Sequence, residues 1–205
     1  MRLHPGFARV STAGLLVATL LVLPASAQSR ETRARSNAVD ISTIRIDNFG
    51  RLSGNYYRGA QPVGRDYTDL ASLGVKTLIN LTSDDADASE KAMTERAGMK
   101  YVQIPMTTHQ APTSAQLAQF LALVNDPANQ PVYVHCAGGR HRTGVMTAVY
   151  RMTQERWSAG KAFQEMKQYR FGADFLHPEF KQFVYAYHLS PAAPAEILVA
   201  GTATH

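Results

Sequence analysis

The chain contains one cysteine, Cys136, and the residues around it are suited to nucleophilic attack on an anion. The segment reads HCAGGRHRTG, so that one alanine, two glycines and then three basic residues follow the thiol. Glycines let successive backbone N–H groups converge on one point, and such a nest binds a tetrahedral oxyanion. The same environment favours the thiolate, which is the nucleophilic form of cysteine. The residues expected to hold the anion are Ala137, Gly138, Gly139, Arg140, His141 and Arg142.

Three neighbouring side chains are expected to complete this loop. Arg142 lies six residues after Cys136, which brings its planar guanidinium to the far side of a bound phosphate, where it can hold two oxygens. Thr143 is expected to donate its hydroxyl to the cysteine sulfur and to help the sulfur leave in a second step. His135 is expected to orient the loop by hydrogen bonding, which is compatible with an ordinary buried histidine.

The elements that must position this loop alternate along the chain. Short runs rich in β-branched and aromatic residues indicate buried strands, and apolar residues with helical spacing lie between them. This alternation predicts a single α/β domain with a mostly parallel sheet flanked by helices. Cys136 would then lie between a strand and a helix, at the edge of the sheet where ligands bind. The expected strands are 75–81, 101–104 and 132–135, and late helices are expected at about 158–169 and 178–189.

Two helix starts carry a capping-box pattern, in which a polar residue is followed three positions later by Glu or Gln. The first is Asp87 with Glu90, and Gly98 is placed to end that helix. The second is Thr113 with Gln116, before a run of apolar residues with helical spacing. A further helix is expected to follow the cysteine loop.

The N-terminal residues have the layout of a secretory signal peptide. Arg2 and Arg9 give a positive start, Ala13–Leu23 is a short apolar run, and Ala25–Ala27 offers a cleavage site between small residues. We expect export, to the periplasm of a bacterium, although a retained membrane anchor is the alternative. The expected parts are a signal peptide (1–27), a mobile lead-in (28–50), a single folded domain that carries the cysteine loop (51–190) and a flexible tail (191–205).

Composition narrows the possible partners. The formal net charge is +5, and about +3 remains after removal of the signal peptide, because that segment holds two arginines and no acidic residue. A mildly basic chain favours anionic partners, but no Lys/Arg-rich run indicates nucleic acid. No later segment is long and apolar enough to span a membrane. The oligomeric state is left open.

The segment His135–Gly144 resembles the His-Cys-x-x-Gly-x-x-Arg-Thr-Gly motif of cysteine-dependent protein tyrosine phosphatases. The flanking stretches YYRGAQP (Tyr56–Pro62), LGVKTLINL and YVQIPM are similar to the dual-specificity branch, especially its small exported bacterial members. The similarity covers about residues 50–175. It implies a sheet of four or five strands, and hydrolysis in two steps through a phosphocysteine, with no metal and no cofactor.

The sequence departs from this family at the general acid. The family usually places an aspartate a few residues after the "IP" of a strand, but residues 107–112 contain no carboxylate. His109 is the nearest residue on this loop that can donate a proton. It is a candidate because histidine changes its protonation near neutral pH. Asp84 and Asp85 are rival candidates at the end of another strand, and Asp174 is a more distant one.

Substrate and class leave alternatives open. The resemblance implies phosphotyrosine, phosphoserine or phosphothreonine in proteins. The basic Arg140 and His141 also suit a crowded polyanion, such as an inositol polyphosphate or a phosphoinositide headgroup, and they resemble plant and fungal atypical members that act on such compounds. A sulfurtransferase and an inactive phosphate-binding module are the alternatives outside this activity.

Overall fold

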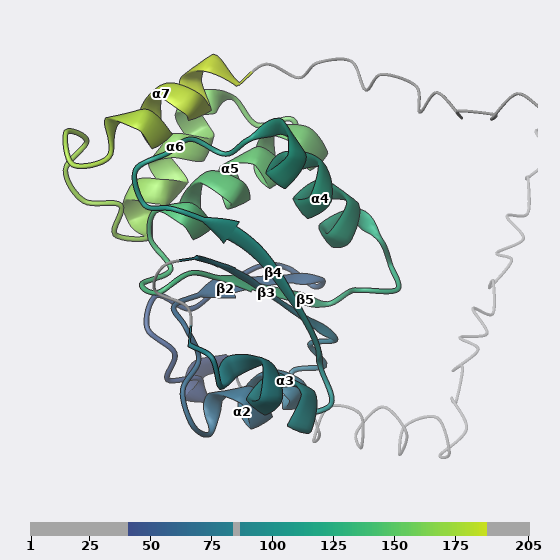
Figure 1. Ribbon diagram of the computed structural model, residues 1–205. Helices are drawn as coiled ribbons and strands as arrows, with labels where there is room; N and C mark the ends of the chain where they lie inside the picture. The colour runs from purple at the N-terminus through teal and green to yellow at the C-terminus, as the bar shows by residue number, and fades with distance from the viewer. Residues whose placement is uncertain (1–40, 84–86, 188–205) are drawn as a thin grey trace, which may run out of the picture. The chain divides into compact units, whose positions relative to one another are not determined.

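The computed structural model describes residues 41–83 and 87–187, and within these residues strands and helices alternate as expected (Figure 1). The expected signal peptide, tail, Asp84 and Asp85 lie outside the described residues. The strands are β1 (Gly50–Ser53), β2 (Tyr56–Gly59), β3 (Thr77–Thr82), β4 (Lys100–Met106) and β5 (Val132–His135). The helices are the 3-10 helix η1 (Ile41–Thr43), α2 (Asp66–Ser72), α3 (Glu90–Arg96), α4 (Ser114–Asn125), α5 (Arg142–Gln154), α6 (Ala159–Gln168) and α7 (Pro178–Ala186).

The five strands form one sheet in the order β1-β2-β5-β3-β4. Only the β1–β2 pair is antiparallel, and the other three pairs are parallel. The central strand β5 lies between β2 and β3, so that His135 is in register with Gly59 on one side and Asn80 on the other. Cys136 therefore leaves the sheet at its carboxyl edge, where the ends of three parallel strands meet.

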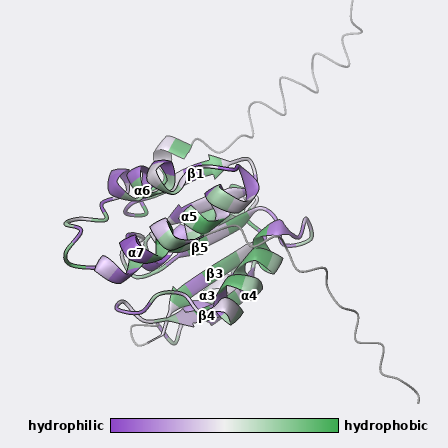
Figure 2. Ribbon diagram, turned by 90° about the horizontal axis from the view of Figure 1, so that it is seen from above, coloured by the Kyte–Doolittle hydropathy of each residue, from purple (hydrophilic) through white to green (hydrophobic). Residues whose placement is uncertain are grey.

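Helices cover both faces of the sheet (Figure 1). α2 and α3 lie on one face, over a core that includes Leu70, Leu78 and Tyr133. α4 to α7 lie on the other face, over a larger core that includes Cys136 and Met146. Figure 2 shows hydrophobic residues along the central strands and hydrophilic residues on α6 and at the start of α7. The helix after the cysteine loop, α5, is thus packed between the sheet and the outer helices.

Several local predictions are confirmed. Thr113 and Gln116 form the predicted capping box, with each side chain bonded to the other residue's backbone N–H. The late helices begin and end close to the predicted residues. The other predicted capping box is wrong. Ser89, not Asp87, is the N-cap of α3, and Glu90 is the first residue of the helix with its side chain fully buried. Asp87 instead accepts hydrogen bonds from the backbone and hydroxyl of Ser89.

The described fold extends further toward the N-terminus than residue 51. Residues 41–50 were predicted as part of a mobile lead-in, yet Ile46 is buried in the core under α2 and α3. Phe49 stacks on Tyr57 and Tyr133, with ring centroids 5.9 and 6.3 Å apart. The apolar residues of this segment are separated by polar ones, and this irregular spacing gives no periodic signal.

Candidate active site

The cysteine loop occupies the predicted place between a strand and a helix. Cys136 directly follows β5 and is buried, with 3% of its surface exposed. Residues 137–141 then lead to the start of α5 at Arg142, where the first backbone N–H groups of the helix are free of intrahelical partners. This arrangement presents N–H groups and the positive end of a helix dipole to an anion beside the sulfur.

Gly139 is required by the geometry of the loop. Its φ is +63°, and a Cβ at this position would lie 2.4 to 2.6 Å from backbone atoms of Gly59 and Ala60. Any other residue would therefore push the loop away from β2. Gly138 is less constrained, because a Cβ there would meet only the side chain of Arg140 at ordinary distances.

Arg142 and Thr143 are both buried at the start of α5. Nη1 of Arg142 donates to the carbonyl oxygen of Met106 at 3.1 Å, which joins the cysteine loop to the end of β4. The predicted hydrogen bond from Thr143 to the cysteine sulfur is not formed. Within the described residues the Thr143 hydroxyl has no hydrogen-bond partner, so it is a buried donor that a change at the sulfur could engage.

His135 takes part in a buried polar network under the loop. Its Nε2 lies 2.9 Å from Oε1 of Glu90, and neither side chain is exposed. Oδ1 of Asn80 accepts from the backbone N–H and hydroxyl of Thr82, so its amide nitrogen must face the other way. That nitrogen donates to the Glu90 carboxylate and, at 3.1 Å, to the Tyr101 hydroxyl. Glu90 is thus held as an acceptor against His135.

A second buried charge, Arg58, lies beneath the loop and was not predicted as a site residue. Its side chain is fully buried, and Nη2 donates to the carbonyl oxygen of Gly139 at 2.6 Å. Its guanidinium lies over the Tyr169 ring, 3.9 Å from the centroid. Within the described residues, Nε and Nη1 have no hydrogen-bond partner, and no ion pair joins Arg58 to a carboxylate. A buried guanidinium without a carboxylate is costly and calls for another negative charge nearby.

Burial lowers the pKa of the Arg58 guanidinium from its ordinary value, because the charged form loses its hydration. Negative charge on nearby groups opposes this effect, and Cys136 is one of these groups. Asn48 supports the same part of the loop, since its amide donates to the carbonyl oxygens of Gly139 at 2.9 Å and Tyr169 at 2.8 Å. These hydrogen bonds therefore hold the cysteine loop, β2 and the end of α6 together.

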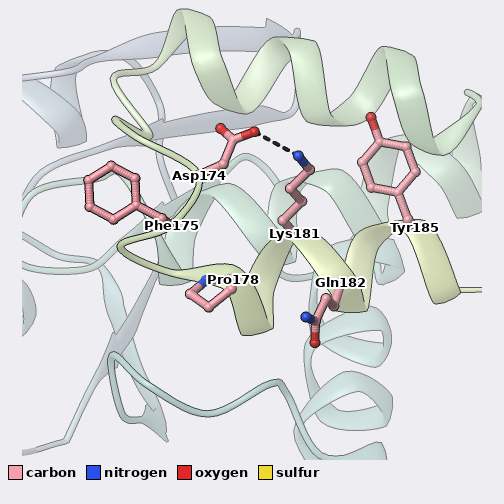
Figure 3. Close-up of a pocket in the computed structure, with 6 residues that line it drawn as sticks. All are labelled: Asp174, Phe175, Pro178, Lys181, Gln182 and Tyr185. Atoms are coloured by element: carbon pink, nitrogen blue, oxygen red, sulfur yellow. Dashed lines mark hydrogen bonds and ion pairs between the residues drawn. The ribbon is translucent and has the colours of Figure 1, made fainter.

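The candidates for the general acid differ in their surroundings. His109 is exposed on the loop after β4 and stacks on His177, with ring centroids 5.3 Å apart. Asp174 is bonded at 2.7 Å to both Lys167 and Lys181, and the latter pair is drawn in Figure 3. These hydrogen bonds lower the pKa of the Asp174 carboxyl, which therefore stays ionised and is a poor proton donor.

The two other basic residues of the loop are not equivalent. His141 is half-buried, its Nε2 lies 2.9 Å from the carbonyl oxygen of Phe171, and its ring packs on His177 with centroids 3.7 Å apart. Burial, followed by the neighbouring charges, lowers the pKa of His141 despite the hydrogen bond to Phe171. Arg140 is exposed and has no hydrogen bond or ion pair to any described residue. Of these two residues, only Arg140 can reach freely toward a ligand.

An open hollow of about 540 Å³ lies beside α7, away from this loop. One of its side chains, Phe175, is strongly exposed, with 79% of its surface accessible. No residue of the cysteine loop lines it, so the hollow is distinct from the chemistry described above. The lining residues, drawn in Figure 3, are Asp174, Phe175, Pro178, Lys181, Gln182 and Tyr185.

Comparison with known families agrees with this geometry. Residues 34–181 match the family model described as "DSP-PTPase phosphatase fused to NAD+ Kinase". The chain belongs to the dual-specificity branch of the cysteine-dependent protein tyrosine phosphatases. This phosphatase is similar to the dual specificity protein phosphatase TpbA of Pseudomonas aeruginosa, with 30% identity over 167 residues, which are 80% of this chain and 73% of TpbA.

A second relative is the inositol diphosphatase SIW14 of Saccharomyces cerevisiae, with 28% identity over 141 residues. These residues are 66% of this phosphatase but only half of SIW14. The solved catalytic core of SIW14 superposes with a TM-score of 0.61 at 28% identity, over 70% of this chain and 87% of that one. The crystal structure of TpbA gives 0.60 at 27% identity, over 75% and 93%. The phosphatase fold is thereby shown.

Proposed function

We propose that this phosphatase hydrolyses phosphotyrosine and other phosphorylated side chains of proteins through a phosphocysteine at Cys136. The observation that carries the proposal is the cysteine loop itself. It brings together a buried sulfur at the end of the central strand, the N–H groups at the start of α5 and the buried guanidinium of Arg142, and we assign the phosphate to the space among them. Phosphoryl transfer needs mainly positioning and charge stabilisation, which this loop supplies.

The first step transfers the phosphoryl group to sulfur. The Cys136 thiolate attacks phosphorus, the bond from phosphorus to the leaving oxygen breaks, and a protonated His109 gives its proton to that oxygen. In the second step water attacks phosphorus, its proton returns to His109, and the sulfur leaves as a thiolate. We assign the unpartnered hydroxyl of Thr143 to the stabilisation of that departing sulfur.

Arg58 and Glu90 act on these steps through the loop and are positioning residues. Arg58 holds the carbonyl of Gly139 and adds a buried positive charge beneath a loop that carries negative charge in every state of the cycle. Glu90 holds the ring of His135, the residue that precedes the nucleophile, in one orientation. The burial of both side chains supports these positioning roles, because neither Arg58 nor Glu90 is exposed to solvent.

The substrate class is supported by a solved relative. TpbA is known in a cysteine-to-serine form in complex with phosphotyrosine, and that structure superposes with a TM-score of 0.59 at 28% identity over 73% of this chain. A second candidate substrate is an inositol polyphosphate. The free side chain of Arg140 at the rim favours it, and so does the similarity to SIW14.

Steady-state kinetics on phosphotyrosine and phosphoserine peptides and on an inositol polyphosphate test both candidates. We expect the highest kcat/KM on a phosphopeptide, and no turnover by Cys136→Ser, which still binds phosphate or vanadate. If inositol polyphosphates are the substrates, Arg140→Ala raises KM for them alone. Binding of phosphate by the wild type without turnover of any of these compounds contradicts the proposal.

We also infer that the protein is exported, on the support of Arg2, Arg9 and the apolar run Ala13–Leu23. Among the described residues no helix has the length and apolar character needed to span a membrane. Expression of the full chain followed by N-terminal sequencing of the periplasmic protein tests this inference. A start near Gln28 supports it, whereas retention of Met1 in the cytoplasmic fraction contradicts it.

A further inference from the structure

We propose that His109, His177 and Glu179 form a binding site for a divalent transition-metal ion such as Zn²⁺, beside the cysteine loop. One ligand atom of each side chain lies within 4.8 Å of the other two. Nδ1 of His177 and Oε1 of Glu179 are 3.3 Å apart. Two ligands of a tetrahedral zinc ion are also about 3.4 Å apart when each is roughly 2.1 Å from the metal. These two side chains therefore already have the spacing of metal ligands.

The third ligand can close the remaining distance. His109 is exposed, and its ring makes no hydrogen bond within the described residues, so little is lost when it moves toward the other two. Nδ1 of His177 also lies 3.0 Å from the carbonyl oxygen of Thr108. The ring therefore has a proton to donate to Thr108 or Glu179, and a metal ion takes the place of that proton.

The donor set selects the kind of ion. Two imidazole nitrogens and one carboxylate oxygen suit Zn²⁺, Co²⁺, Ni²⁺ or Cu²⁺, whereas Mg²⁺ and Ca²⁺ prefer oxygen ligands alone. Three protein ligands leave a position of a tetrahedral ion open to water or to an oxygen of a ligand.

The place of the site links it to the enzyme's activity. His109 lies on the loop after β4, whereas His177 and Glu179 lie at the start of α7, so the ion would tie these two segments together. The ring of His177 packs on His141 of the cysteine loop. A bound ion would hold His109 away from the leaving oxygen, and we expect it to inhibit the enzyme. This inhibition rests on the proposed function, whereas metal binding does not.

Binding is tested with the full chain, without a polyhistidine tag, in the Cys136→Ser form, so that the thiolate cannot serve as a ligand. Titration with Zn²⁺ against a chromophoric chelator should show one ion per chain. Adding Glu179→Gln or His177→Gln should weaken this binding at least about tenfold, as loss of groups that hold a metal does. Glu95→Gln, on the exposed face of α3, is the matched control and should bind as Cys136→Ser does.

The outcomes separate cleanly. Absence of Zn²⁺ binding by Cys136→Ser, or binding that is unchanged by both Glu179→Gln and His177→Gln, overturns the site. The inhibition is measured on wild type and Glu179→Gln with an alkyl phosphate, because its poor leaving group depends on the proton that His109 supplies. A rise of at least about tenfold in the inhibitory Zn²⁺ concentration supports the link. Equal inhibition of both proteins overturns it and places the inhibiting ion elsewhere.

Discussion

Arg142 begins α5 and Arg58 lies on β2, and their substitutions should have different effects. Arg142→Lys keeps the charge but loses the fork that can hold two phosphoryl oxygens. We expect kcat to fall by about 10²-fold or more, as it does when one preorganised donor is removed. Steady-state kinetics on an aryl phosphate measure this change, and a nearly normal lysine variant would mean that the loop does not wrap phosphate as argued.

Arg58→Met should weaken catalysis without removing any group that touches the substrate. The Gly139 carbonyl keeps its hydrogen bond from Asn48, so the main loss is the buried charge. Hydrogen bonds that involve a charged group contribute about 1.5–3 kcal/mol, and we therefore expect kcat/KM to fall about tenfold to a hundredfold. The rate of Cys136 alkylation by iodoacetamide at neutral pH should fall as well, because the variant lacks the buried positive charge that interacts with negative charge on the sulfur.

Arg151→Met provides the control for that experiment. Arg151 is also buried and lies over an aromatic ring, but it is paired with Glu165 and Glu155. Its loss should lower the melting temperature and leave the alkylation rate unchanged. Equal alkylation rates for folded Arg58→Met and wild type would remove Arg58 from its proposed role, and Arg58→Lys repeats the test if the methionine variant does not fold.

His109→Ala should slow the hydrolysis of alkyl phosphates much more than that of p-nitrophenyl phosphate. An alkoxide needs its proton while the bond breaks, whereas nitrophenolate is stable enough to leave almost unaided. A placed proton donor contributes about 10²–10⁴ in rate, so the loss should approach this range only for the poor leaving group. If Asp84→Asn or Asp85→Asn carries this dependence instead, one of those residues is the acid.

Local sequence predicted the part of the site that is contiguous in the chain. The loop from Cys136 to Arg142 and the strand before it lie where the motif placed them. Arg58, Glu90 and His177 reach the same place from 30 to 80 residues away, and only tertiary packing brings them there. Glu90 misled the prediction, because its spacing from Asp87 is also that of a capping box.

The turn between α6 and α7 is held by charges on both helices. Asp174 accepts from Lys167 of α6 and Lys181 of α7, and these hydrogen bonds lower the pKa of its carboxyl (Figure 3). A lowered pKa means that ionised Asp174 stabilises the fold above its ordinary pKa of 3.8, and that this stabilisation is lost as pH falls through the folded-state value. Asp174→Asn should therefore lower the melting temperature at pH 7 and have little effect at the lowest pH.

Thermal unfolding of both proteins across acid pH measures the difference. Asp69→Asn, which removes a half-buried carboxylate whose ion pair within the described residues is to the exposed Arg65, is the control and should lower the melting temperature less at pH 7. A difference in melting temperature between wild type and Asp174→Asn that stays constant down to the lowest pH would show that ionised Asp174 does not stabilise this turn.

Elements with a strong periodic or capping signal were predictable, and those with weak signals were not. The strand at Val132–His135 and the capping box of α4 were predicted residue by residue. The short helix α2 and the antiparallel strand β1 were missed, because each is short and carries no periodic or capping pattern of its own. Their stability comes from packing on the sheet, a contribution that sequence pattern does not show.

The fold class was predictable for the molecule as a whole, because alternating strands and helices leave few alternatives to a parallel sheet with helices on both faces. The order of the strands was not, since nothing in the local pattern shows that β5 enters between β2 and β3. That order decides which distant residues surround Cys136.

The position of β5 in the middle of the sheet delays folding during synthesis of the chain. β2 and β3 do not pair with each other, and each pairs with β5, which comes more than 50 residues later in the chain. The first hundred or so residues therefore cannot assemble the sheet alone, and the central contacts span long stretches of chain. Such nonlocal pairing slows folding. A ribosome-bound chain that lacks residues 132–154 has neither the complete sheet nor the nucleophile. Catalytic competence thus arises only after the chain has been synthesised beyond these residues.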